Sequence, residues 1–426
     1  PEIAKTENSN GDKGNVFVFF DQSLSMQGYV KDQPGQKNLY VNVIDDLQQI
    51  AENVGSTTYY HAFGKSIKPL KERDIAKVIK PSFYDCKGAT AACNNQESKI
   101  ELPFKMAKAN PDGTYIIVTD LFLADKQLVG GTLKQLTKPL KSILKKGKSI
   151  GIIGVMSSFN GTIYDIPIKD GGTMKYTEAN MRPYYIIVIG DQKNINRIKS
   201  NLQEQHFTDP EDEYKFALIT SSPVLQNLNV NQLISENNIA KISKADSFKF
   251  EYFDELLPIY QFDTNKKRKM NFKIKKEEII VPGSSGVGEY TINESLWSSK
   301  ETKCKKIESE GSWRKAKFES IGIVNYDEND LTLSLFKNVS LKNLFLGMRY
   351  FYFVDIYAEK PGTASEKDFE EWSVRSSDAE KYANDNPVKF KTLNLTKIIK
   401  ILNAVSNDTF EKTLIASFAM DFNLIK

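Results

Sequence analysis

The sequence predicts an α/β protein, with a doubly wound, mostly parallel sheet in its first half and a β-rich, sandwich-like second half. In the first half, continuous apolar runs alternate with segments of helical period, which is typical of buried parallel strands covered by helices. From residue 206 onward, short alternating runs separated by turn residues indicate antiparallel strands. The composition agrees, because 426 residues with 40% hydrophobic and 26% charged side chains suit a folded chain of two or three domains.

The elements of the first half follow one another in a regular order. Strands are predicted at Val16–Phe20, Thr57–Phe63, Ile67–Leu70, Tyr115–Thr119, Ile150–Val155 and Tyr184–Ile189. Apolar residues recur with helical period between them and predict helices at Leu39–Val54, Lys99–Ala109, Thr132–Lys146 and Asn194–Gln203. Ser98 and Glu101 have the spacing of a capping box at the second of these helices. We therefore place an α/β domain at residues 13–205 and one or more β-rich domains at residues 206–426.

One segment of the α/β domain interrupts the alternation. Between residues 157 and 181, Asn160-Gly161 and Asp170-Gly171-Gly172 lie between β-prone runs, which predicts hairpins. This insertion takes the place of a crossover helix, so we expect the strand after it to pair in an unusual way. In the second half, strands are predicted at Phe248–Phe253, Met270–Ile274, Ile279–Val281, Leu331–Phe336 and Arg349–Tyr357, with a helix at Leu393–Val405 and a closing strand at Leu414–Leu424.

Charge and hydropathy limit the classes of partner. The chain has 58 Lys+Arg against 54 Asp+Glu, and the net charge of +4 is too small to indicate a nucleic-acid binder. No window approaches 18 uninterrupted apolar residues, so we expect no transmembrane segment in this chain. Residues 1–12 are polar and predict a flexible tether, as expected behind a signal peptide or a lipid anchor. A trimmed cytoplasmic protein would look the same, and we favour an extracytoplasmic bacterial protein: periplasmic, surface-exposed or lipid-anchored.

The cysteines and histidines exclude most zinc sites, because the chain has three of the former and two of the latter. Cys86 and Cys93 bracket a short loop. They form either a small disulfide, which would favour an oxidising compartment, or two free thiols. Cys304 is expected to be a buried thiol.

A polar motif follows the first predicted strand. Asp21-Gln22-Ser23-Leu24-Ser25 places a carboxylate and two hydroxyls on one loop, and these are the oxygen ligands that Mg²⁺, Mn²⁺ and Ca²⁺ prefer. Asp120 directly follows another strand, and the carboxyl ends of parallel strands meet at one edge of a sheet. We expect this loop to be exposed, so that Asp21→Ala would leave the fold intact. In the alternative interpretation, Asp21 and Asp120 only cap the helices that follow them.

On these residues the chain resembles the von Willebrand factor A domain family and its metal-ion-dependent adhesion site, over about the first 190 residues. That family pairs D-x-S-x-S after its first strand with a Thr on a later loop and an Asp after its fourth strand. No Thr matches cleanly, and Ser98 replaces it as the best candidate, ahead of Thr90. The resemblance implies a bound Mg²⁺, or Mn²⁺ or Ca²⁺, whose shell is completed by a carboxylate of a protein partner, with the metal ligands Asp21, Ser23, Ser25, Ser98 and Asp120.

The predicted function is non-enzymatic, a protein–protein interaction, adhesion or scaffold role. A D-x-S-x-S loop offers no general base, and neither histidine lies in a recognisable catalytic motif. One alternative is a cytoplasmic assembly factor or co-chaperone with the same type of domain, acting beside an ATPase, because the chain has no phosphate-binding loop of its own. A phosphoryl-transfer hydrolase with Asp21 as nucleophile is less favoured, because Ser23 stands where a second Asp is expected.

Overall fold

A computed structural model describes residues 14–31, 37–85, 95, 97–122, 131–164, 172–176, 181–208, 213–221, 244–250, 253–263, 270–275, 287–299, 314–316, 322–326, 330–335, 348–361, 369–381 and 390–425. Several predictions fall outside the described residues: the tether at residues 1–12, the strand at Ile279–Val281, Thr90, and the three cysteines. Among the residues that are described, no helix has the length and apolar character needed to cross a membrane.

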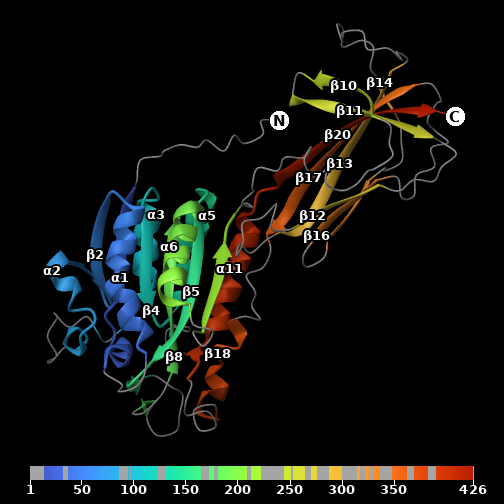
Figure 1. Cartoon of the computed structure of the whole chain (residues 1–426). Coiled ribbons are helices and arrows are strands. Elements are labelled where there is room, and N and C mark those ends of the chain that lie inside the picture. Colours follow the sequence, from blue (N-terminus) through green and yellow to red (C-terminus); the bar gives the residue numbers. More distant parts are fainter. Residues whose placement is uncertain are drawn as a thin grey trace.

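A seven-stranded sheet organises the first part of the chain (Figure 1). Its strand order is β3-β2-β1-β4-β8-β5-β9. At its centre β2, β1 and β4 are parallel, and β5 points in the same direction, whereas β3, β8 and β9 run the opposite way. The strands are β1 (Asn15–Asp21), β2 (Thr57–Phe63), β3 (Ile67–Leu70), β4 (Thr114–Thr119), β5 (Ser149–Ser158), β8 (Met181–Gly190) and β9 (Tyr214–Ile219). The prediction of an α/β domain is thus confirmed, with a sheet that is parallel at its centre and mixed beyond β4.

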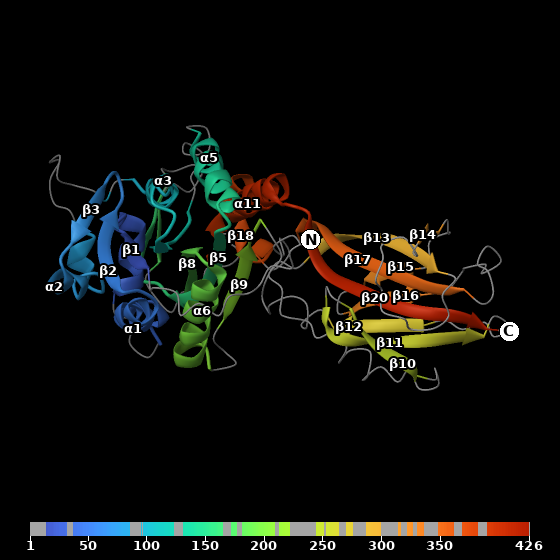
Figure 2. The ribbon, with the colours of Figure 1, turned by 90° about the horizontal axis from the view of Figure 1, so that it is seen from above.

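Helices cover both faces of this sheet, which is why its central strands are apolar along their whole length. Every residue of β4 and of β5 is buried. Figure 2 shows α1 and α6 on one face and α3, α5 and α11 on the other, and the buried residues form two clusters that match these two faces. The helices are α1 (Leu39–Val54), α3 (Glu101–Ala109), α5 (Thr132–Lys145), α6 (Gln192–His206) and α11 (Leu395–Thr409), with short helical turns at η1 (Leu24–Val30), α2 (Glu72–Ile75), η2 (Pro81–Phe83) and η4 (Ser376–Asp378).

The insertion between β5 and β8 contains a hairpin, as expected. Strand β6 (Gly161–Ile163) pairs antiparallel with β7 (Met174–Tyr176). Strand β8 then returns directly beside β5 and lies between β5 and β4, antiparallel to both. The predicted unusual pairing is confirmed, because a strand that follows its neighbour without a crossover helix can only run back in the opposite direction.

The core of the sheet extends beyond residue 205. Strand β9 is its outermost strand, and described residues between 369 and 409 return to cover it. In this returning segment Phe369, Trp372 and the apolar face of α11 belong to the same buried cluster as α3 and α5. The boundary expected between residues 205 and 206 therefore does not separate the two parts. The chain leaves the first sheet after β9, returns to it with Trp372 and α11, and leaves it again for β20.

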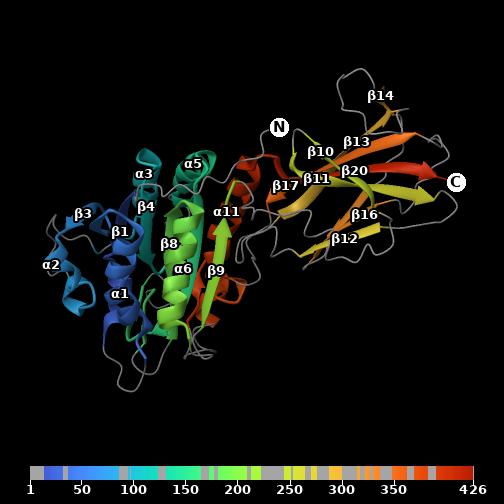
Figure 3. The same cartoon turned by 45° about the horizontal axis from the view of Figure 1, so that its top comes forward.

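The β-rich part consists of two main sheets (Figure 3). One has six strands in the order β10-β11-β20-β17-β13-β14, and the other has three in the order β12-β16-β15. All pairs in them are antiparallel except β11 with β20. The strands of these two sheets are β10 (Lys244–Phe250), β11 (Phe253–Asp263), β12 (Met270–Lys275), β13 (Val287–Ser299), β14 (Arg314–Lys315), β15 (Gly322–Tyr326), β16 (Asp330–Leu335), β17 (Arg349–Pro361) and β20 (Thr413–Ile425). A small pair outside both sheets joins β18 (Ser373–Val374) to β19 (Thr392–Leu393).

Candidate functional site

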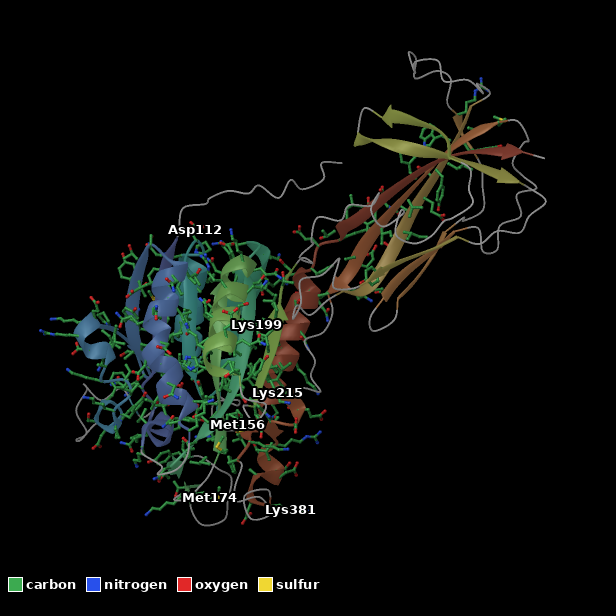
Figure 4. The ribbon with its side chains drawn as sticks, in the orientation of Figure 1. Asp112, Met156, Met174, Lys199, Lys215 and Lys381 are labelled. Carbon is green, nitrogen blue, oxygen red and sulfur yellow. The ribbon has the colours of Figure 1, made fainter. Side chains whose placement is uncertain are left out.

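The carboxyl ends of β1, β4 and β5 lie at one edge of the seven-stranded sheet. The register places Phe20 beside Val118, so Asp21 lies level with Thr119. In Figure 4 this edge is the one near Met156 of β5 and Met174 of β7, at the end opposite Asp112, which precedes β4. The predicted site residues that follow β1 and β4 therefore meet at one edge, as expected for a sheet of this kind.

Asp21 is the centre of the site and is fully buried. Its Oδ2 accepts hydrogen bonds from the hydroxyls of Ser98, at 2.6 Å, and Thr119, at 2.7 Å. Its Oδ1 accepts the backbone N–H of Ser23, at 2.9 Å. The expectation of an exposed loop is wrong for Asp21, because the strands on both sides and the loop itself enclose its carboxylate. An alanine at this position would leave these three donors without their acceptor.

The two serines of the motif lie directly beside this carboxylate. The hydroxyl oxygens of Ser23 and Ser25 are 3.0 Å apart. Ser23 is buried and precedes the short helix η1, whereas Ser25 and Ser98 are partly exposed. Ser25 and Ser98 therefore lie on the solvent-facing side of a site whose carboxylates are buried.

Ser98 lies ahead of helix α3, and its hydroxyl contacts Asp21. Helix α3 begins at Glu101, with Ile100 at the N-cap, so the expected capping box is displaced from the helix end. The Ser98 hydroxyl donates to Asp21 instead. Ser98 therefore lies beside the D-x-S-x-S residues, as predicted. It does not occupy the N-cap position of α3, which was also predicted for it.

Asp120 is also buried and has a different principal partner. Its Oδ2 accepts a hydrogen bond from Nη2 of Arg182 at 2.9 Å, and its Oδ1 accepts the backbone N–H of Phe122 at 3.2 Å. Arg182 lies at the start of β8 and is fully buried. Its guanidinium lies against the rings of Phe122 and Phe159, each 5.0 Å from the guanidinium carbon. A buried arginine of this kind is stable only with a counter-charge, and Asp120 supplies it.

Sequence reasoning missed Thr119 and Arg182. A signal for Arg182 was present, because an arginine inside the apolar run Met181–Gly190 requires a buried partner. The sequence does not show which carboxylate pairs with Arg182, because that depends on the pairing of β8 with β4. Thr119 precedes Asp120 at the end of a buried strand, and only the register with β1 shows that its hydroxyl reaches Asp21.

The hairpin insertion holds the D-x-S-x-S loop in place. The backbone N–H of Asn160 donates to the carbonyl of Gly28 at 2.8 Å. The ring of Phe159 packs so closely on Gly28 that a Cβ there would lie 2.4 Å from it. A Cβ on Gly161 would lie 2.7 Å from the Cα of Gly28. The same insertion thus packs against the segment that follows β1 and leads into β8, which places Arg182 beside Asp120.

The site carries buried negative charge that its positive groups do not fully neutralise. Burial, and secondly the charge of Asp120, raise the pKa of Asp21 to about 6, against the hydrogen bonds from Ser98, Ser23 and Thr119. With both carboxylates ionised and Arg182 positive, the three groups sum to one negative charge. A cation beside Asp21 would relieve this charge, so the oxygen-rich donor set fits a hard divalent ion.

The donor set is mostly hydroxyl oxygen. Within the part of the chain that the structure describes, no three His, Cys, Asp or Glu side chains gather as a metal-binding group. A site formed by Asp21, Ser23, Ser25 and Ser98 would instead hold a metal through one carboxylate, three hydroxyls and water. Asp120 lies near enough to Asp21 to raise its pKa, and it is bound to Arg182.

No protein-family model, curated protein or solved structure matches the chain.

Proposed function

We propose that the protein is a non-enzymatic interaction protein that binds a divalent cation, foremost Mg²⁺, at Asp21, Ser23, Ser25 and Ser98, with Asp120 beside them. In this proposal a carboxylate of a protein partner completes the metal shell, as the resemblance to the von Willebrand factor A domain family implies. The bound cation would supply the charge that attracts this carboxylate. The chain's own residues hold the site in shape and keep its carboxylates away from water.

One observation carries the proposal: residues 77 positions apart in the chain, Ser98 and Asp21, meet at 2.6 Å at the carboxyl edge of the sheet, next to Ser23 and Ser25. The raised pKa of Asp21 supports the proposal in energetic terms, since burial and the charge of Asp120 disfavour its ionised form and a bound cation would offset both. The partly exposed serines leave the site open toward solvent.

The test is thermal unfolding in EDTA and in millimolar Mg²⁺, Mn²⁺ or Ca²⁺. An ion present at ~100 times its dissociation constant should stabilise the native chain by about 2.7 kcal/mol. Asp21→Asn should abolish this stabilisation, because it removes the charge while keeping an oxygen for the N–H of Ser23. Ser23→Ala should weaken it.

Asp112→Asn is the matched control, since Asp112 is an exposed carboxylate at the far end of the sheet. It should leave the stabilisation unchanged. An equal shift in the wild type and in Asp21→Asn would place the ion elsewhere and refute the proposed site. Once an ion is shown to bind, tighter Mn²⁺ binding in the presence of an acidic peptide would support the role of a partner carboxylate.

The cellular setting stays a prediction. An extracytoplasmic, lipid-anchored or surface location fits an adhesion or scaffold role, and the cytoplasmic assembly-factor alternative would use the same cation site beside an ATPase partner. Fractionation of the native protein distinguishes the two.

A further inference from the structure

A second polar site lies at the outer side of the seven-stranded sheet, at the opposite end of β2 from the proposed cation site. It is a notch of about 290 Å³ between the end of α1, strand β2 and the start of α2. Thr58 of β2 lines it, and the register places Thr58 beside Val16, whereas Phe63 lies beside Asp21. The two sites are therefore separate.

The notch contains an open strand edge. Strand β3 pairs with β2 only over Tyr60–Phe63. On that side, Thr57–Tyr59 have no strand partner among the residues that the structure describes. The notch opens beside this stretch, next to Leu70, where β3 ends. An extended segment of another protein can add to such an edge by backbone hydrogen bonds.

Two buried hydroxyls in the notch have no other residue within hydrogen-bond distance in the described part of the chain, and they lie near each other. They are the phenol of Tyr60, whose side chain is only 7% exposed, and Oγ1 of Thr58. Buried polar atoms nearly always have a partner. Two such hydroxyls within three residues of one strand therefore point to a ligand group that hydrogen-bonds here.

The charge of the notch is negative. Glu52 and Glu72 line it, and neither belongs to an ion pair in the described part of the chain. Burial, followed by the charges of Glu52 and Glu72, raises the pKa of Tyr60, so its phenol stays protonated and neutral. Burial also lowers the pKa of His61, so this neighbouring ring adds no positive charge at neutral pH.

We propose that this notch binds the ammonium group of a lysine side chain carried by an extended segment of a partner protein. An ammonium group has three N–H donors and no acceptor. Both hydroxyl oxygens and both carboxylates can accept from it. Pro69 and Leu70 also line the notch, which offers apolar surface to the lysine's methylene stem. The proposal does not depend on a cation at Asp21.

The experiment is calorimetric titration of the full chain with acetyl-Gly-Lys-Gly-amide. Versions of the peptide with arginine, norleucine or glutamate in place of lysine serve as comparisons. Tyr60→Phe and Glu72→Gln should each weaken lysine-peptide binding about tenfold, because the first removes a hydrogen bond to a charged group and the second removes a negative charge opposite the ammonium. Glu204→Gln, an exposed carboxylate on α6, is the matched control and should bind as the wild type does.

Tyr60→Phe also separates binding from folding. The variant removes an oxygen that has no partner in the described structure, so its midpoint of urea unfolding should not fall. Weaker binding at unchanged stability supports the proposal. Three outcomes would overturn it: no heat with the lysine peptide, equal binding of the norleucine or glutamate peptide, or unchanged binding in both variants. Tighter binding of the arginine peptide would show that the ligand is a guanidinium and that the ammonium assignment is wrong.

Discussion

Arg182 and Asp120 form a salt bridge of 2.9 Å in which both side chains are almost completely buried. The two residues are 62 positions apart: Arg182 lies on β8, and Asp120 directly follows β4, the antiparallel neighbour of β8. Nε and Nη1 of Arg182 have no hydrogen-bond partner within the described structure, so Asp120 and the surrounding rings provide most of its stabilisation. The pair ties the hairpin insertion to the edge that carries Asp21.

Removing one partner of this pair should destabilise the fold strongly. Arg182→Met is expected to lower the free energy of unfolding by about 3–5 kcal/mol, because Asp120 would remain buried without a counter-charge. Adding Asp120→Asn to that variant should restore much of the loss. Urea unfolding of the two single variants and the double variant measures the coupling. Additive effects would show that the two charges do not depend on each other.

The same arginine should weaken cation binding at the proposed site. Its positive charge lies on Asp120, next to the oxygens that would hold the ion. Arg182→Met, provided that circular dichroism shows it folded, is therefore expected to bind Mn²⁺ at least about tenfold more tightly than the wild type. Mn²⁺ titration followed by electron paramagnetic resonance measures this. Weaker binding would mean that Arg182 supports the ligands more than it repels the ion.

Asp21 should reduce the stability of the metal-free chain at neutral pH. Its pKa is about 6 in the folded chain and 3.8 as the ordinary value, so between these values the folded state holds more protons than the unfolded state. The contribution of Asp21 to stability is then fully present below pH 3.8 and declines as the pH rises to about 6. Two pKa units correspond to up to about 3 kcal/mol.

Asp21→Asn removes this penalty. In EDTA at pH 7 we expect the variant to be more stable than the wild type, by up to about 3 kcal/mol, and its stability to lose the decline between pH 4 and 6. Urea unfolding across this pH range tests both expectations. A variant less stable than the wild type at pH 7 would show that the hydrogen bonds of Ser98 and Thr119 outweigh the burial of the charge.

Gly161 should tolerate no side chain. A Cβ there would lie 2.7 Å from the Cα of Gly28, and backbone cannot move aside as a flexible side chain can. Gly161→Ala is expected to cost about 1–3 kcal/mol and to reduce the stabilisation by divalent ions, since the hairpin would shift away from the D-x-S-x-S loop. An unchanged urea midpoint together with unchanged ion binding would show that the hairpin does not hold this loop.

Trp372 should stabilise the α/β part although it lies after the β-rich strands. It is 3% exposed and packs closely on Gly154 of β5, where a Cβ would lie 2.8 Å from its ring. Trp372→Ala is expected to cost about 3–5 kcal/mol. A chain ending at residue 205 would lack β9, Trp372 and α11, and should expose the apolar face of β5 and bind a hydrophobic dye. A stable, soluble fragment would restore the boundary expected at residue 205.

The sequence by itself determined the local elements and the chemistry of the candidate site. Apolar runs and helical periods are properties of neighbouring residues, so the strands around β1 and β4 and helices such as α1 could be predicted from them. The position of Asp21 at the end of a buried strand also sufficed to place it beside Asp120, because the carboxyl ends of such strands share an edge.

The tertiary structure decided which distant segments met. Arg182 signalled that a buried counter-charge was needed, but the 54 Asp and Glu residues could not be ranked by sequence alone. Only the pairing of β8 with β4 selects Asp120. Trp372 and α11 likewise return to the first sheet because they bury an apolar face of β5 and β9 that would otherwise contact water. Long-range contacts of this kind form because they bury apolar surface of the whole fold. A pattern of neighbouring residues cannot show which distant segments will do so.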